Sequence, residues 1–549
     1  MTTERRESTK HVTVASRIAR ICEWSLWSVS VVGLSLCSTL VQAQIKVNVD
    51  FSKESNILTS YSMGAAAVMS NSTNFAPGVI PYLRSTGAET LVYPGTPQVA
   101  DLYQWESHSL ASYKGASAPY LAPESDFGHF AVLASQLGGG VVIVNYGSNR
   151  SGTGGGDPKQ AAAWVAYANA NSASTQVIGK GADGTDWHTV GYWAAMRSAA
   201  PLAQDDGYNF LRIGQQKPLN LKLWQIGDQL YNNGFYGATH ASEPDLHGSI
   251  PTSARDLGRL NKNPALAPAA IAQNVALYAD AMKAVDPTIK IGVALPTPPE
   301  GNGTFPDFTR TMLRKACSAI DYVGLTWTPT ALLPPDYKAL DEAQSLSNIK
   351  NQVGTVLRSY LDEVGQDCPK NHIPQIAFEP ATVPTWARRE HAVFDTLWLD
   401  ASYPLLIEAG IVNVAWPELY GDTFLSTDKS KLGPAYYGLQ LVHIIAHTPG
   451  DMFVVAGSSD AAVDVHATRR RDGVLGVMLV NEDPKRPATV KLSLQGARAD
   501  SKAKRFDYGW KQQTSGAGLT ISDITDFSND FTITVPPYTV TDLLVPQAK

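Results

Sequence analysis

Side chains that could do chemistry follow directly after two β-forming runs of the sequence. Glu379 comes at the end of Q-I-A-F, and Asp228 and Gln229 come just after L-K-L-W-Q-I-G. A carboxylate can act as a nucleophile, a general acid or a general base, whereas a carboxamide has no dissociable proton near neutral pH. The sequence therefore offers carboxyl chemistry at Glu379 and Asp228 and excludes proton transfer by Gln229.

The elements that must position these side chains are parallel β/α units. Between about residues 60 and 447, short β-branched runs alternate with helical patterns, and Asp157-Pro158 and Ala267-Pro268 mark two helix starts. We expect a (β/α)₈ barrel; a doubly wound open sheet is the alternative, but no G-x-G-x-x-G follows the first strand. The expected strands are 62–68, 90–93, 140–145, 221–226, 290–295, 322–327, 375–378 and 411–416.

The pattern changes after His447 to short alternating strands separated by turn residues. The runs 473–480, 489–494, 504–508 and 531–535 predict an antiparallel β-sandwich that needs no helix, and 45–51 is expected to add a strand to it. The predicted organisation is therefore a signal peptide at 1–43, a barrel at 60–447, and a sandwich built from 44–59 plus 448–549.

Five segments occur in the order typical of one family of enzymes. They are Y-P-G at 93–95 with A-D-L-Y-Q-W at 100–105, N-Y-G at 145–147, L-K-L-W-Q-I-G-D-Q at 221–229, A-W-P-E-L at 415–419 and G-P-A-Y-Y at 433–437. Together they resemble the arabinofuranosidase-like retaining glycosidases of the large (β/α)₈ clan with a C-terminal β-sandwich. The resemblance covers most of the chain that follows the predicted signal peptide.

The resemblance implies two carboxyl groups about 5 Å apart, one attacking the anomeric carbon and one giving and then taking a proton. Glu379 matches the nucleophile; a rim carboxylate in an ordinary salt bridge is the alternative. The acid is the last Glu of W-E-I-G-N-E, and Gln229 stands there in this chain. Because adjacent residues leaving a strand point in different directions, we expect that Asp228 does not simply inherit the proton-transfer role. Asp228 could instead bind a sugar hydroxyl or raise the pKa of Glu379.

Other positions depart from the family as well. Thr326-Trp327-Thr328-Pro329 stands where the family has His-Trp-Tyr-Pro, and Val92 where it often has Arg. One interpretation is a hydrolase whose leaving group departs without protonation, or whose acid is Glu243 or Glu418. A second is a glycan-binding protein without catalysis, and a third is a structural scaffold.

The same resemblance predicts where a carbohydrate binds. Tryptophans at strand ends or in loops can stack on sugar rings, although core packing is the alternative for about half of them. No metal and no cofactor is expected, because the histidines form no ligand set. The predicted substrate-binding residues are Trp105, Asn145, Thr326, Trp327, Trp416 and Glu418.

The N-terminus and the composition suggest export. Basic residues precede the apolar stretch 24–40, and V-Q-A at 41–43 predicts cleavage to a secreted or periplasmic protein, with an uncleaved membrane anchor as the alternative. Cys317 and Cys368 would then form a disulfide or remain two buried thiols. The net charge of −6 leaves no basic field for nucleic acid.

Overall fold

The computed structural model describes residues 44–548, apart from 96–98, 113–118, 233–244, 249–263, 298–305, 328–341, 370–371, 381–391, 418, 421–423 and 426–430. The predicted signal peptide lies outside these residues. Within them, none of the helices has both the length and the apolar character that crossing a membrane requires.

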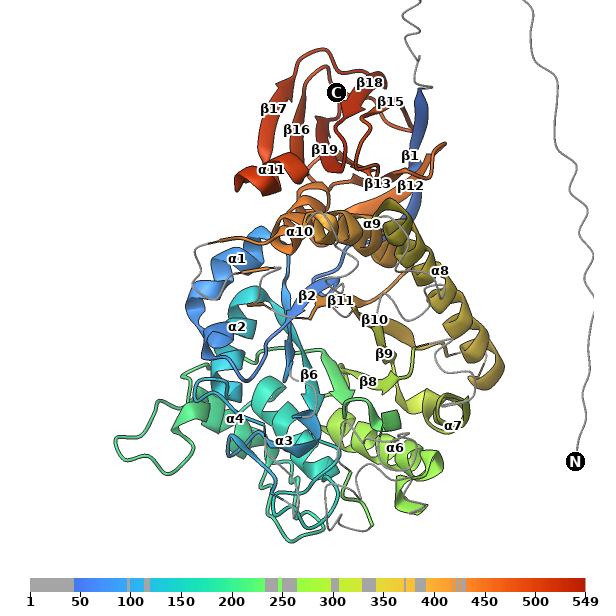
Figure 1. Ribbon diagram of the computed structural model, residues 1–549. Helices are drawn as coiled ribbons and strands as arrows, with labels where there is room; N and C mark the ends of the chain where they lie inside the picture. The colour runs from blue at the N-terminus through green and yellow to red at the C-terminus, as the bar shows by residue number, and fades with distance from the viewer. Residues whose placement is uncertain are drawn as a thin grey trace, which may run out of the picture. The chain divides into compact units, whose positions relative to one another are not determined.

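Eight parallel strands form a closed barrel, as predicted (Figure 1). Each predicted strand is present within two residues of its expected ends. Their β-branched and small residues fit the interior of a barrel that is buried on both faces. In barrel order the strands are β2 (Met63–Ala66), β3 (Thr90–Tyr93), β6 (Gly139–Val144), β7 (Leu223–Ile226), β8 (Lys290–Leu295), β9 (Tyr322–Trp327), β10 (Gln375–Pro380) and β11 (Asn413–Trp416).

Helices surround the barrel and begin at residues suited to capping. Asp157 accepts a hydrogen bond from the backbone of Lys159 at the start of α3, where Pro158 fits the first helical position. Asp126 and Thr189 cap α2 and α4 in the same way. The helices are α1 (Ile80–Ser85), α2 (Phe127–Leu137), α3 (Pro158–Asn169), α4 (Val190–Ser198), α6 (Pro268–Val285), α7 (Pro306–Ala316), α8 (Glu342–Asp367), α9 (Phe394–Glu408) and α10 (Pro434–Ile445).

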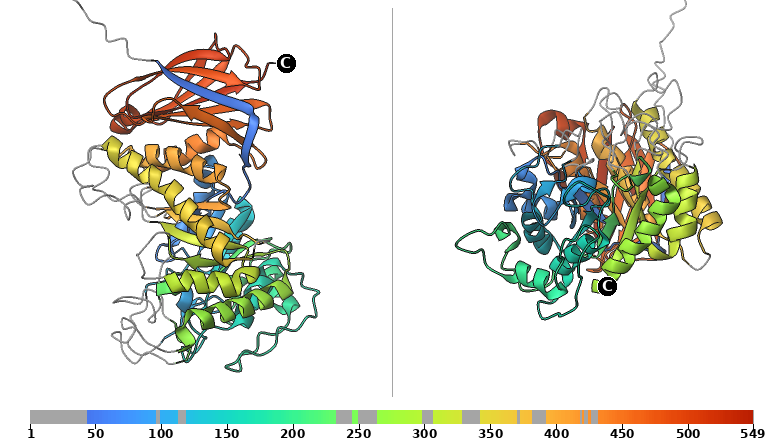
Figure 2. Two further views of the ribbon diagram at one scale, coloured as in Figure 1. Left: turned by 90° about the vertical axis from the view of Figure 1, so that its right-hand side faces the viewer. Right: turned by 90° about the horizontal axis from the view of Figure 1, so that it is seen from below.

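The C-terminal strands form one curled, mostly antiparallel sheet where two separate sheets were expected. Strand β1 from the start of the chain pairs with β12 on one side and with β15 on the other, so it joins the two halves (Figure 2, left). A short helix that the sequence did not suggest, α11 (Trp510–Ser515), follows β16. The sheet order is β17 (Thr520–Ile524), β16 (Ala503–Gly509), β19 (Thr539–Pro546), β14 (Val474–Asn481), β13 (Val463–Arg469), β12 (Met452–Ser458), β1 (Ile45–Ile57), β15 (Ala488–Gln495), β18 (Asp530–Val535).

A disulfide lies beside the sixth and seventh barrel strands. Cys317 follows α7 and Cys368 follows α8, and the structure joins their sulfur atoms, with the two Cα atoms 5.8 Å apart. The bond therefore ties α7 to α8 on the outer side of the barrel.

Helices α9 and α10 lie between the barrel and the sheet, and two buried acids meet there (Figure 1). Asp400 of α9 and Asp542 of β19 are fully buried, and neither carboxyl group makes a hydrogen bond to a described residue. Burial raises the pKa of Asp400 well above its usual range, and the charge of Asp542 adds to the rise. The pKa of Asp542 is raised by its own burial and then by the charge of Asp507, which is itself paired with Arg505.

We expect Asp400→Asn to stabilise the protein increasingly as the pH rises from 4 to 8. A carboxyl group whose pKa is raised by folding stabilises the native state below its unfolded pKa, and that contribution is lost as the pH rises through the folded pKa. A carboxamide stays neutral throughout, so the gain in unfolding free energy should reach about 1–3 kcal/mol at pH 8. Thermal and urea unfolding at several pH values measure it. Asp530→Asn, an exposed change in β18 of the same sheet, is the control, and an equal effect of Asp400→Asn at every pH would contradict the expectation.

Candidate functional site

The two strands that carry the expected catalytic residues lie three places apart in the barrel order, β7 and β10. Glu379 is the fifth residue of β10, and its backbone pairs in register with Thr326 of β9. The side chain of Glu379 lies outside the described structure. Its backbone position is nevertheless the C-terminal end of a barrel strand, where enzymes with this fold carry their catalytic groups.

The turn after β7 has an unusual backbone. Gly227 has φ of 62° and Gln229 has φ of 43°, both in the left-handed region. A side chain at Gly227 would collide with Leu230, so a glycine is required there. Gln229 is not a glycine, and a positive φ at such a residue costs free energy that the surroundings must supply. Backbone strain of this kind clusters at functional sites.

A buried carboxyl group, Asp101, holds this turn against the neighbouring strand. Its Oδ1 accepts a hydrogen bond from the backbone N–H of Tyr146 at 2.9 Å, and its Oδ2 accepts one from the backbone N–H of Asp228 at 3.1 Å. Asp101 therefore links the segment after β3 to the ends of β6 and β7. Its pKa is raised well above the usual range, first by burial and further by the charges of Asp228 and Asp245, although the two backbone hydrogen bonds oppose the rise.

Asp228 is half-buried beside Asp101, and its pKa is raised to about 6. Burial is the cause, and a hydrogen bond from the backbone of Gln229 opposes it. At this pKa the carboxyl group is protonated in a substantial fraction of molecules in mildly acidic solution, which is what a general acid requires. Asp228 can therefore hold a transferable proton, a property that the sequence did not indicate.

Asp228 and Thr326 line a common cavity inside the barrel of about 30 Å³. This volume suits a water molecule or two. Residues from β9, β10 and β11 complete the wall, among them Phe378, which precedes Glu379. The structure thus brings Asp228, Thr326 and the end of β10 to one place. The lining residues are Val92, Val141, Ile143, Gln225, Asp228, Ala294, Gly324, Leu325, Thr326, Ala377, Phe378, Asn413 and Ala415.

The three tryptophans expected to stack on sugar are packed in the core. Trp105, Trp327 and Trp416 are at most 1% exposed. Trp105 stacks on Trp164, and the other two pack against Trp398. Their ring faces are covered in this structure, so stacking on a ligand is not open to them there.

The remaining expected residues fall into two groups. The Asn145 side chain is engaged in its own turn, donating to the Ser148 carbonyl at 2.8 Å and accepting from the Ser148 N–H at 3.1 Å. Glu418 and Glu243, the possible substitute acids, lie outside the described residues. Their roles, like that of Thr326 in substrate binding, stay predictions.

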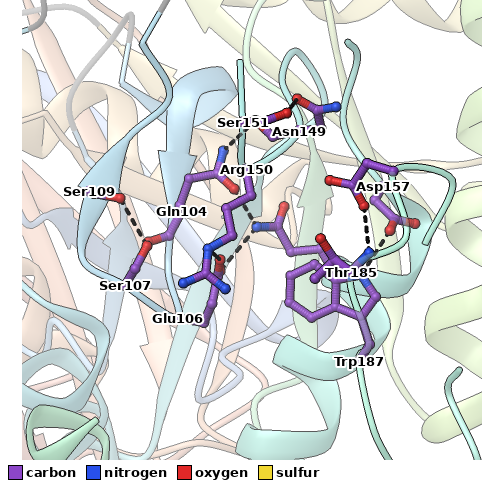
Figure 3. Close-up of polar contacts among 12 residues, drawn as sticks. Gln104, Glu106, Ser107, Ser109, Asn149, Arg150, Ser151, Asp157, Thr185 and Trp187 are labelled. Atoms are coloured by element: carbon purple, nitrogen blue, oxygen red, sulfur yellow. Dashed lines mark hydrogen bonds and ion pairs between the residues drawn. The ribbon is translucent and has the colours of Figure 1, made fainter. Parts of the chain in front are cut away.

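A buried polar network supports the Asp101 side of the site (Figure 3). Gln160 of α3 donates its two amide hydrogens to Gln104 at 2.7 Å and to Glu106 Oε2 at 3.0 Å. The other Glu106 oxygen lies 3.8 Å from Arg150 Nε. Burial raises the pKa of Glu106, and the hydrogen bond from Gln160 and the charge of Arg150 partly offset that rise.

This network continues to Asp101 through Ser148. Gln104 donates to Ser148 Oγ at 3.3 Å, and Ser148 Oγ donates to the backbone carbonyl of Asp101 at 2.9 Å. On the far side, the ring of His247 packs 4.8 Å from that of Tyr146, and Asp245 accepts hydrogen bonds from His247. The loops after β3, β6 and β7 are thereby joined by side chains.

Sequence reasoning missed three acidic residues of this region, Asp101, Glu106 and Asp245. A signal was present for two of them: Asp101 interrupts the apolar A-D-L, and Glu106 directly follows Trp105. A charged residue inside an apolar segment is buried with partners or exposed by a turn, and only the partners tell which. Within the part of the chain that the structure describes, no group of three or more His, Cys, Asp or Glu residues is arranged to hold a metal ion.

Comparisons with known proteins identify the fold. No protein-family model matches the sequence, and no curated protein matches it either. Solved structures do match: an α-L-arabinofuranosidase from Thermotoga maritima in complex with arabinose is 15% identical with a TM-score of 0.62, over 92% of this chain and 100% of that one.

Two further structures are similar over nearly their whole length. A family 51 α-L-arabinofuranosidase from Bifidobacterium longum is 14% identical with a TM-score of 0.61, covering 91% of this chain and 99% of its own. A glycoside hydrolase family 44 endoglucanase from Clostridium thermocellum is 15% identical with a TM-score of 0.56, with the same coverage. The likeness shows a shared fold, the barrel with its C-terminal sheet.

We expect Gln160→Leu to destabilise the protein by about 1–3 kcal/mol, because Gln104 and Glu106 would lose their shared donor while staying buried. The loss should grow as the pH rises, since removal of the hydrogen bond raises the pKa of Glu106 further and its charged form becomes costlier. Urea unfolding at pH 5 and pH 8 measures both effects. Gln136→Leu, the same substitution at an exposed position of α2, should change stability by less than about 0.5 kcal/mol. Equal effects of the two substitutions would refute the role given to Gln160.

Proposed function

We propose that the protein is an exported glycoside hydrolase that cleaves O-glycosyl bonds of an oligosaccharide or polysaccharide with retention of configuration. The observation that carries this proposal is geometric: Asp228, in the turn after β7, lines the same cavity of the closed barrel as Phe378, the residue before Glu379 in β10. The raised pKa of Asp228 supports it. The shared fold with arabinofuranosidases and an endoglucanase supports it.

Glu379 is the proposed nucleophile. Its carboxylate attacks the anomeric carbon while the bond from that carbon to the leaving-group oxygen breaks, which gives a glycosyl ester on Glu379. Support comes from its place at the end of β10, the seventh barrel strand, and from the pairing of its backbone in register with Thr326 of β9. Further support is that Thr326, the register partner of Glu379, lines the same cavity as Asp228.

Asp228 is the proposed proton donor in place of Gln229. In the first step its carboxyl proton passes to the departing oxygen, and the resulting carboxylate then takes a proton from water as that water's oxygen attacks the anomeric carbon and releases Glu379. The raised pKa supports this role. Asp101, which accepts the Asp228 N–H, positions the turn.

A second candidate function is glycan binding without hydrolysis. It is favoured by the carboxamide at Gln229, which has no proton to give to a leaving group but can still hydrogen-bond to sugar hydroxyl groups. Under this alternative the barrel keeps its fold and Asp228 serves only to bind hydroxyl groups.

We expect measurable hydrolysis of aryl glycosides with good leaving groups, and Glu379→Gln should lower kcat/KM by at least 10³-fold because no nucleophile remains. Gln229→Glu should raise turnover of substrates with poor leaving groups by about 10–100-fold, since it restores a carboxyl group at the acid position. Gln229→Asn serves as a control for the change of side chain without an added proton. No turnover with any aryl glycoside, together with oligosaccharide binding by calorimetry, would establish the second candidate.

The pH dependence should identify Asp228. Because its raised pKa keeps the group protonated below about pH 6, kcat/KM for a poor leaving group should fall as the pH rises through that value. Asp228→Asn should remove this limb of the pH profile and cost about 10²–10⁴-fold with poor leaving groups, but far less with 2,4-dinitrophenyl glycosides. An unchanged profile in Asp228→Asn would assign the proton to another group.

A further inference from the structure

A second, larger cavity lies where the barrel meets the sheet. Its volume is about 730 Å³, within the range of ligand sites. It is bounded by the start of α10, by α11, and by the residue Ala392 that precedes α9; Figure 1 shows α11 beside α10. We call it the junction groove. Its described lining consists of Ala392, Lys431, Leu432, Gly433, Pro434, Tyr437, Tyr508, Gln513, Thr514, Ser515, Gly516 and Ala517.

Two stacked tyrosines form one wall of the junction groove. The rings of Tyr437 (α10) and Tyr508 (β16) lie 4.3 Å apart at an angle of 22°. Tyr437 is half-buried and Tyr508 is 3% exposed, and neither hydroxyl group hydrogen-bonds to a described residue. Stacking holds the rings rigid, and their polar ends remain able to bond a ligand.

The opposite wall is formed by polar side chains of α11. The Gln513 carboxamide of α11 makes no hydrogen bond to a described residue. The hydroxyl protons of Thr514 and Ser515 are donated to backbone carbonyls of their own helix, which leaves their oxygen lone pairs to accept. Among the described lining residues Lys431 alone is charged. The phenol, carboxamide and hydroxyl groups of the described lining, which includes no carboxylate, suit a hydroxyl-rich, neutral or anionic ligand.

The junction groove lies at the same end of the barrel as the proposed catalytic residues. In a barrel of parallel β/α units each helix begins at the end where the preceding strand finishes. Ala392 precedes α9, which follows β10, and residues 431–434 lead into α10, which follows β11. The groove therefore borders the end of the barrel that carries Glu379 and Asp228.

We infer that the junction groove binds a distant stretch of the polysaccharide chain whose cleavage is proposed for the barrel. The inference rests on the proposed function and makes the substrate a polymer. The sheet then has a role in binding through Tyr508 and α11. A chain held at the groove raises the local concentration of its bonds at the barrel, as a second binding module does.

The test separates the groove from the barrel by comparing polymers with small substrates. Gln513→Ala and Tyr437→Ala are expected to raise KM for a soluble polysaccharide, or its Kd in a Glu379→Gln background, by about fivefold or more. Both variants should keep the parent kcat/KM on a 4-nitrophenyl glycoside. The probes are arabinan, xyloglucan and polygalacturonate, and a preference for polygalacturonate would assign an anionic chain to the groove beside Lys431.

Two controls keep the outcome decisive. Tyr192→Ala removes an exposed tyrosine of α4 and should leave polymer binding unchanged. Gln513→Ala shortens a half-buried side chain of the short helix α11, outside the hydrophobic core, so it serves if Tyr437→Ala lowers the melting temperature. Unchanged polymer binding in a folded Gln513→Ala variant, or no binding of any of the three polymers, overturns the inference. Polymer binding lost in both groove variants, without aryl glycoside turnover in the parent, sustains the groove and rejects hydrolysis.

Discussion

The buried carboxyl group of Asp101 is the interaction on which the geometry of the site depends. Its two oxygens accept backbone hydrogen bonds from Tyr146, just beyond β6, and from Asp228, just beyond β7. The two backbone hydrogen bonds fix where each segment leaves its strand, because loss of either bond would leave a buried polar group without a partner. The arrangement requires that the Asp101 carboxyl group, either charged or protonated, stay buried inside the protein.

That constraint carries over to the chemistry. Burial and the charges of Asp228 and Asp245 raise the pKa of Asp101, and burial raises the pKa of Asp228, so ionisation of both Asp101 and Asp228 is disfavoured. A proton is thereby kept near the mouth of the barrel. The network through Ser148, Gln104, Gln160 and Glu106 keeps the Asp101 loop in position without touching the cavity. The network thus positions the residues around the site, and this role is consistent with a buried acidic group, Glu106, being kept there.

The barrel could be predicted from the sequence because strand and helix periodicities are local. A run of six residues is enough to indicate a strand such as Tyr322–Trp327 or Lys290–Leu295. The position of Glu379 follows from the same pattern. The partners of Asp101 do not, since they lie 45 and 127 residues away and are backbone amides, which leave no mark in a sequence. For Trp105, Trp327 and Trp416 the sequence does not distinguish core packing from ligand binding. A tryptophan at a strand end fits either place until its neighbours in the fold are known. The joining of two expected sheets into one depends on β1 pairing with β15, residues 45–50 with 490–495.

The exchange of acid and amide that the family resemblance implies at positions 228 and 229 would be less disruptive in this fold than strand geometry suggests. Alternation of side chains between two faces holds within a strand, and β7 ends at Ile226. Beyond it, Gly227 and Gln229 both adopt left-handed backbone conformations, so the directions of 228 and 229 are set by the turn and by the hydrogen bond to Asp101. Asp228 consequently reaches the cavity that Thr326 and Phe378 also line. Under the proposed function, a carboxyl group displaced by one residue in the sequence can in this way stay near the reacting bond. A chain without the usual acid at position 229 can then still carry out acid catalysis through Asp228.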